Sequence, residues 1–246
     1  YGDHRDLHLS LRRQRQMCIR DSVSTEGATL GAEVTTDILD ILAEAHTKLS
    51  EGQGAELLWR DSLDKQLKPL DALKVYALKT SPAFEAAMLS GIRLAQPIGE
   101  YREPVKQFAR NLGVAFQILN DLLDWQGDDF NKMAAGGDVL GGRPTVLHAL
   151  ALETLPADKR DELLDLCRED SIASVVRIER VKHLYESVGV FEMALQLVDK
   201  HQARAESIAD EIEPEDLRRL MYFLIDSILE RPEEQIQQLV ATPIEV

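Results

Sequence analysis

The chain has 246 residues, of which 44% are apolar, so it can bury a sizeable hydrophobic core in one large domain or two small ones. Its formal net charge of -15 argues against nucleic acid as a partner but leaves a small phosphorylated substrate open, because a metal ion can bridge carboxylates to phosphate. The two cysteines, Cys18 and Cys167, exclude a disulfide framework and a cysteine-ligated zinc site. No apolar run reaches the roughly 18 residues that a membrane span needs. We therefore expect a cytoplasmic protein without a membrane span.

The first 22 residues differ in composition from the rest of the chain. Tyr1–Ser22 carries five arginines against three aspartates, whereas the remainder is strongly acidic. The apolar segment of a secretory signal is absent, and the ending, Met17–Ser22, resembles a translated sequencing-library adapter. We predict that residues 1–22 form a non-native or disordered tail without a structural role, and that the body of the protein is residues 23–246.

Residues 33–59 have apolar side chains at helical spacing and predict one long helix. Gly52 and Gly54 lie inside this helix, and each glycine costs a helix about 1 kcal/mol relative to alanine. Two explanations stay open: close packing against another helix, or room for a ligand beside Gln53 and Glu56.

A proline can open the next helix at Pro69, because proline is favoured in the first helical turn. Lys79-Thr80-Ser81-Pro82 then predicts a kink or a new start at Ser81, since proline disfavours helical geometry in the residue before it. A kink there can direct Lys79 and Thr80 into a cavity.

Residues 101–125 predict a long helix with two different faces. Opposite its apolar stripe stand only amides and carboxylates: Gln117, Asn120, Asp121 and Asp124. A solvated polar face is one explanation. The other is a magnesium site, because magnesium takes hard oxygen donors from a protein when phosphate oxygens complete its shell.

A glycine-rich segment, residues 136–145, predicts a loop that holds Asp138 and Arg143. Such loops let backbone N–H groups approach phosphate, although the signal is weak by itself. Helical patterns continue over residues 146–155, 161–167, 172–185, 191–208 and 215–230, and no strand pattern occurs. The histidines outside the tail show no metal-ligand spacing and are expected to be structural or superficial: His46, His148, His183 and His201.

Four of these segments resemble, in order, the motifs of the polyprenyl synthetase family, the all-trans isoprenyl diphosphate synthases. Gln53–Glu56 is similar to GQ-x-x-D, with glutamate at the aspartate position, and Lys79–Thr80 to a KT segment. Residues 116–124 are similar to FQ-x-x-DD-x-x-D, with Asn120 at the first aspartate. Residues 137–145 are similar to GKD-L-x-x-GK-x-T, with Arg143 in place of a lysine.

The resemblance implies an all-α fold, an isoprenoid-synthase-type helical bundle around a central cavity, of which residues 23–246 form the C-terminal part. The implied activity is a magnesium-dependent prenyltransferase that condenses isopentenyl diphosphate with an allylic prenyl diphosphate. The implied catalytic residues are Lys79, Gln117, Asp121 and Asp124. The implied diphosphate-binding residues are Lys79, Thr80, Gln117, Arg143, Gln53 and Glu56. The implied Mg²⁺ ligands are Asn120, Asp121 and Asp124.

The sequence lacks the motifs expected in the first half of such a protein: GKR-x-RP, a first DD-x-x-D and an adjacent arginine pair. We therefore expect an N-terminally truncated chain that is inactive alone and whose full-length form is a homodimer. Three alternatives stay open. They are a class I terpene cyclase, whose corresponding motif begins with Asn-Asp, a non-catalytic regulatory subunit, and a helical scaffold without a site.

Overall fold

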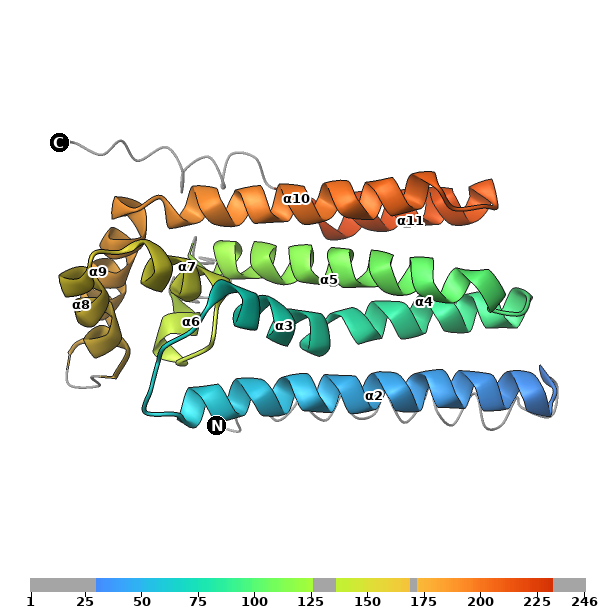
Figure 1. The fold of residues 1–246 in the computed structure, drawn as a ribbon, viewed down its shortest axis with the longest axis horizontal. Coiled ribbons are helices and arrows are strands. Elements are labelled where there is room, and N and C mark those ends of the chain that lie inside the picture. The colour runs from blue at the N-terminus through green and yellow to red at the C-terminus, as the bar shows by residue number, and fades with distance from the viewer. Residues whose placement is uncertain (1–29, 126–135, 169–171, 232–246) are drawn as a thin grey trace, which may run out of the picture.

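A computed structural model describes residues 30–125, 136–168 and 172–231, and these residues fold into a bundle of helices (Figure 1). The helices are α2 (Ala32–Asp61), α3 (Pro69–Lys79), α4 (Ser81–Ala95), η1 (Gly99–Tyr101), α5 (Arg102–Asp124), α6 (Gly137–Leu140), α7 (Val146–Thr154), α8 (Ala157–Arg168), α9 (Ser174–Ser187), α10 (Val190–Asp210) and α11 (Glu215–Ile228). No strand occurs in the described ranges. The all-α prediction is confirmed, while the predicted tail, residues 1–22, lies outside the described residues.

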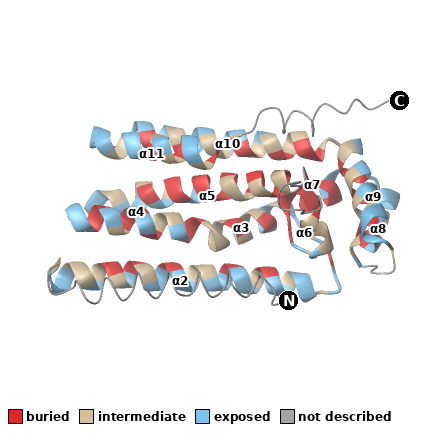
Figure 2. Cartoon of the chain, turned by 180° about the vertical axis from the view of Figure 1, so that it is seen from behind, coloured by how far each residue is buried: buried red, intermediate tan, exposed pale blue. Residues whose placement is uncertain are grey.

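The long helices run side by side, and the short ones gather at one end. Figure 1 shows α2, the α3–α4 pair, α5 and α10 with nearly parallel axes, and α6 to α9 at the left of the view. Helix α5 packs against α10 and α4, and α2 packs against α3 and α4. Burial is concentrated on α5 (Figure 2), where Phe108, Leu112 and Ile118 have no exposed surface. The amphipathic pattern of this helix therefore places it at the centre of the core.

The predicted break near Ser81 is confirmed. Helix α3 ends at Lys79 and α4 begins at Ser81, with Thr80 between them at φ -122° and ψ -49°. Pro82 occupies the first turn of α4, where the missing N–H costs nothing. The break therefore leaves Lys79 and Thr80 at a junction between two collinear helices (Figure 1).

Two of the predicted boundaries are wrong. Residues 137–140 were expected in a loop but form α6, whose single turn is closed by a hydrogen bond of 2.9 Å from the Gly141 N–H to the Gly137 carbonyl. Helix α8 starts at Ala157, not at residue 161, because the Pro156 carbonyl already accepts a helical hydrogen bond from the Arg160 N–H at 2.9 Å.

Two glycines set close approaches between helices. A Cβ at Gly52 would lie 2.7 Å from the backbone nitrogen of Lys79 and 2.8 Å from the carbonyl carbon of Leu78, so α2 touches the end of α3. A Cβ at Gly113 would lie 2.6 Å from Ser81 Oγ, so α5 touches the start of α4. By contrast, a Cβ at Gly54 would meet no atom within 4 Å. Close packing therefore explains Gly52 and does not explain Gly54.

The linker between α2 and α3 is attached to the bundle through Lys65, which is only 8% exposed. Its ammonium group donates to the Arg60 carbonyl at 2.5 Å, at the C-terminal end of α2, where a positive charge is favoured by the helix dipole. Its own carbonyl oxygen lies 3.0 Å from Nε2 of the buried His148 on α7. The linker thus joins α2 to α7.

The described helices are all too short or too polar to cross a membrane.

Candidate functional site

The residues singled out in the sequence come from four parts of the chain: the C-terminal half of α2, the α3–α4 junction, the C-terminal half of α5, and the turn that contains α6. Hydrogen bonds and ion pairs join them, three across these elements and one within the α6 turn. The sequence motifs therefore lie together in space, with the exception of Gln53.

An ion pair joins α2 to the end of α3. The Lys79 ammonium group donates to Glu56 Oε2. Glu56 is 7% exposed, whereas the Lys79 side chain keeps 30% of its surface in solvent. Gly52 stands four residues before Glu56, on the same helix face, and its missing side chain lets the two helices come close enough for this contact. Gln53 is exposed and its side chain makes no hydrogen bond within the described residues.

A chain of hydrogen bonds runs from the α3–α4 junction into α5. Thr80 Oγ1 donates to Gln117 Oε1 at 3.3 Å, and Gln117 Nε2 donates to Asp121 Oδ1 at 3.2 Å. The other oxygen of this carboxylate, Oδ2, accepts a hydrogen bond from the Tyr76 hydroxyl. That hydroxyl in turn accepts from the Val146 backbone N–H, at 2.6 Å, in the first turn of α7.

Asp121 is therefore an interior residue, in contrast to its expected position on an open polar face. It is 2% exposed and its oxygens accept from protein donors on both sides. Burial raises the pKa of the Asp121 carboxyl from 3.8 to about 7, and the hydrogen bond from Tyr76 offsets part of that rise. Tyr76, which contributes this contact, is not among the residues that the sequence motifs singled out.

A second carboxylate of α5 holds the α6 turn. Asp124 Oδ2 accepts a hydrogen bond from the Asp138 backbone N–H at 2.9 Å. Burial raises the pKa of Asp124, while this hydrogen bond lowers it. The side chain of Asp138 is ion-paired with Arg143 at 2.6 Å, and Arg143 keeps 57% of its side chain in solvent. The sequence placed Asp138 in a loop without giving it this partner.

The oxygen donors available to a metal ion are few. Within the described ranges, no three side chains of histidine, cysteine, aspartate or glutamate are grouped so that they could hold a metal ion. Asn120 is partly buried, stands one turn before Asp124, and its side chain makes no hydrogen bond within the described part of the chain. The Asn120 side chain is therefore free of hydrogen bonds within the described residues, and Asp124 is hydrogen-bonded through Oδ2. By contrast, Gln117 uses both ends of its amide, and Asp121 is buried with both oxygens engaged.

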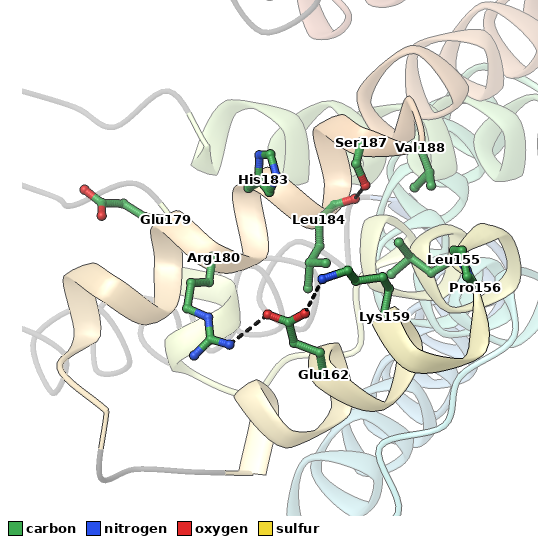
Figure 3. Close-up of a pocket in the computed structure, with 10 residues that line it drawn as sticks. All are labelled: Leu155, Pro156, Lys159, Glu162, Glu179, Arg180, His183, Leu184, Ser187 and Val188. Carbon is green, nitrogen blue, oxygen red and sulfur yellow. Dashed lines mark hydrogen bonds and ion pairs between the residues drawn. The ribbon is translucent and has the colours of Figure 1, made fainter. Parts of the chain in front are cut away.

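A surface cleft of about 530 Å³ lies apart from these residues. It is formed between α8 and α9 and contains an ion-paired Glu162 held by Lys159 at 2.9 Å and Arg180 at 2.8 Å (Figure 3). None of the predicted site residues lines it.

The sequence profile of the family described as polyprenyl synthetase matches residues 19–188. The chain belongs to the polyprenyl synthetase family. A curated relative of this chain, a short chain isoprenyl diphosphate synthase of Methanocaldococcus jannaschii, is 29% identical over 154 residues, which cover 62% of this chain and 46% of that protein. An octaprenyl diphosphate synthase of Escherichia coli is 34% identical over 118 residues, which cover 46% of this chain and 35% of that protein.

Solved structures of synthetases also resemble this polyprenyl synthetase chain. A geranylgeranyl pyrophosphate synthetase from Pyrococcus horikoshii superposes with a TM-score of 0.71 at 22% identity, over 82% of this chain and 61% of that one. A geranylgeranyl pyrophosphate synthase from Corynebacterium glutamicum, complexed with isoprenyl diphosphate and magnesium, gives 0.70 at 23% identity, over 82% of this chain and 57% of that one. At these identities the likeness shows the fold. The chain spans about half the length of the curated relatives that it matches.

Proposed function

We propose that this polyprenyl synthetase chain carries the diphosphate-binding half of a trans-prenyltransferase site. The observation that supports the proposal best is the junction between α3 and α4, where the break at Thr80 presents Lys79 and Thr80 beside Gln117. A cationic side chain, a hydroxyl and an amide gathered in this way suit the oxygen atoms of a diphosphate. Arg143 adds a second, largely exposed cation at the α6 turn. Glu56 holds Lys79 in place through their ion pair. Gln53 would bind diphosphate only if its side chain moved or if a substrate reached it.

The proposed reaction condenses isopentenyl diphosphate with an allylic prenyl diphosphate. The bond between C1 and oxygen of the allylic substrate breaks, and the diphosphate leaves with the electron pair. The double bond of isopentenyl diphosphate then attacks C1, and a proton is lost from the adduct. Lys79 and Arg143 would stabilise the negative charge that develops on the leaving diphosphate.

Magnesium fits part of this site. Mg²⁺ commonly binds through one or two protein oxygen ligands and completes its shell with phosphate and water. Asn120 and Asp124 can supply two such oxygens, one carboxylate and one weaker amide, whereas Asp121 has its carboxylate inside the helix interface. When bound, the ion would neutralise charge on the diphosphate. We place Asn120 and Asp124 in the proposed metal set.

The test is calorimetric titration of the purified chain with isopentenyl diphosphate and with dimethylallyl diphosphate, in the presence of Mg²⁺. Lys79→Gln keeps a donor for Glu56 but removes the charge, so we expect about tenfold weaker binding. The matched control is Lys74→Gln on the same helix. Lys74 is exposed and forms an ion pair with Asp71 at 2.9 Å. Equal affinities in the two variants would contradict the proposed diphosphate site.

Turnover separates the remaining alternatives. We expect no condensation by this chain alone, because its sequence contains no first DD-x-x-D motif. When a second polypeptide supplies a first DD-x-x-D motif, consumption of an allylic diphosphate without isopentenyl diphosphate would favour a cyclase. Diphosphate binding without any turnover would favour a regulatory subunit. We also propose that the protein assembles as a homodimer and is located in the cytoplasm. The small number of cysteines suits a cytoplasmic location.

A further inference from the structure

Tyr76 stands at the centre of the hydrogen-bond chain that leads to the proposed diphosphate site. It is 4% exposed and lies on α3, one turn before Lys79. Its hydroxyl is a donor to Asp121 on α5 and an acceptor from the Val146 N–H on α7, so both of its hydrogen-bonding functions are used. One side chain therefore ties three helices together directly behind the site.

The hydrogen bond from the Tyr76 hydroxyl fixes the position of the Asp121 carboxylate. With Tyr76 on Oδ2 and Gln117 Nε2 on Oδ1, each carboxylate oxygen has a protein donor. Removing one donor would leave a buried carboxylate underbonded, which is costly in a poorly solvated interior. Asp121 is therefore held toward α3 and α7, whereas Asn120, the residue before it, and Asp124, one turn later, are only partly buried.

The Asp121 carboxylate in turn orients the side chains of Gln117 and Thr80. Because Asp121 accepts from Nε2 of Gln117, the amide of Gln117 must present Oε1 to Thr80, which donates to it at 3.3 Å. An amide that turned over would place Gln117 Oε1 against Asp121 Oδ1, two acceptors, and the Thr80 hydroxyl would have to accept from Nε2 instead of donating. The orientation of Thr80 is thus set, through two intermediates, by Tyr76.

We infer that Tyr76 is a positioning residue of the diphosphate site: through Asp121 and Gln117 it orients Thr80, and it holds Asp121 as a buried anchor that does not ligand a metal ion. This inference rests on the proposed function. It reassigns Asp121, one of the three implied metal ligands in residues 116–124, from ligand to support.

The experiment measures binding of inorganic pyrophosphate to the whole chain by calorimetry, at a series of Mg²⁺ concentrations. Tyr76→Phe keeps the ring but deletes the hydroxyl, and we expect about tenfold weaker pyrophosphate binding. The matched control is Tyr222→Phe, because Tyr222 makes the same kind of contact, a hydrogen bond of 2.6 Å to Asp210, on the exposed surface between α10 and α11. We expect that control to bind pyrophosphate like the wild type.

Asp121→Asn provides a second variant that does not depend on the folding of Tyr76→Phe. An amide has one acceptor oxygen, so it can serve Tyr76 or Gln117 but not both. We expect about tenfold weaker binding for Asp121→Asn. The double variant, Tyr76→Phe with Asp121→Asn, should bind no worse than either single variant, because both substitutions break the same hydrogen-bond chain. Additive losses of about a hundredfold would overturn the inference.

The dependence of pyrophosphate binding on the Mg²⁺ concentration distinguishes a buried anchoring role of Asp121 from a role as a metal ligand. We expect Asp121→Asn to leave the half-saturating Mg²⁺ concentration unchanged, whereas Asp124→Ala raises it severalfold. If Asp121→Asn raises it as much as Asp124→Ala, Asp121 is a ligand and the inference fails while the proposed function stands. If Tyr76→Phe binds pyrophosphate as tightly as the wild type, the inference also fails alone. If the wild-type chain binds no pyrophosphate at any Mg²⁺ concentration, the proposed function and the inference fail together.

Discussion

Substituting alanine at Gly52 and at Gly54 should have opposite effects on stability, although both glycines lie in α2. Either change removes a helix penalty of about 1 kcal/mol. At Gly52 the new Cβ would stand 2.7 to 2.9 Å from two backbone atoms of α3 and from Leu78 Cβ, so the helices must separate. Such overpacking typically costs about 1–3 kcal/mol. We therefore expect Gly52→Ala to lose roughly 0–2 kcal/mol and Gly54→Ala to gain up to about 1 kcal/mol.

The assay is urea unfolding of both variants and the wild type, followed by far-ultraviolet circular dichroism. The difference between the variants isolates the steric contact, since the propensity gain is common to both, and we expect it to be about 1–3 kcal/mol. Gly52→Ala should also weaken diphosphate binding, because the clash displaces the backbone of Lys79. Equal unfolding free energies for the two variants would refute the conclusion that a side chain at Gly52 would clash with α3.

Three further predictions concern a buried histidine, the motif asparagine and a second glycine. Burial lowers the pKa of His148 from 6.5 to about 4, so its neutral form stabilises the fold above pH 6.5 and that contribution is lost as the pH falls to 4. Between pH 6.5 and pH 4, the unfolding free energy of the wild type minus that of His148→Gln should fall by about 3 kcal/mol. A difference that stays constant over this range would contradict the prediction. Asp121 titrates in both proteins, so its opposite effect on stability cancels in the difference. Asn120→Asp should lower the Mg²⁺ concentration needed for diphosphate binding, because a carboxylate is a stronger hard donor than an amide; an unchanged titration would remove Asn120 from the metal set. Gly113→Ala should lower the melting temperature by several degrees through its contact with Ser81, and an unchanged melting temperature would show that the α4–α5 contact can relax.

Local patterns in the sequence predicted most of the helices, because each depends on residues three or four apart. The break at Ser81 followed from Pro82 in the same way. The single turn of α6 was missed since four residues are too few to show a period. Helix geometry alone already separates Gln53 from Glu56: Gln53 lies about 100° around α2 from Gly52, whereas Glu56 shares the face of Gly52.

The arrangement of the site could be predicted only in part, because its contacts join distant positions. Tyr76 and Asp121 are 45 residues apart, and a tyrosine on an apolar stripe gives no sign that its hydroxyl has a buried partner. Asp121 was grouped with Asp124 because both stand opposite the apolar stripe of residues 101–125 and match aspartates of the family motif. Asp121 meets Tyr76 of α3, whose hydroxyl also contacts α7, whereas Asp124 meets the backbone of the α6 turn, and no local pattern records these different partners.

The anchoring of Lys65 has a consequence for how two copies of this chain could combine. Exchange of a terminal helix between copies needs a linker that can straighten and act as a hinge. The segment between α2 and α3 has no regular structure, yet Lys65 fixes it to the end of α2 and to His148 on α7. Straightening it would strip a buried ammonium group of its carbonyl partner. Helix α2 is therefore kept on its own chain, and any assembly of this protein should join complete subunits instead of swapped ones.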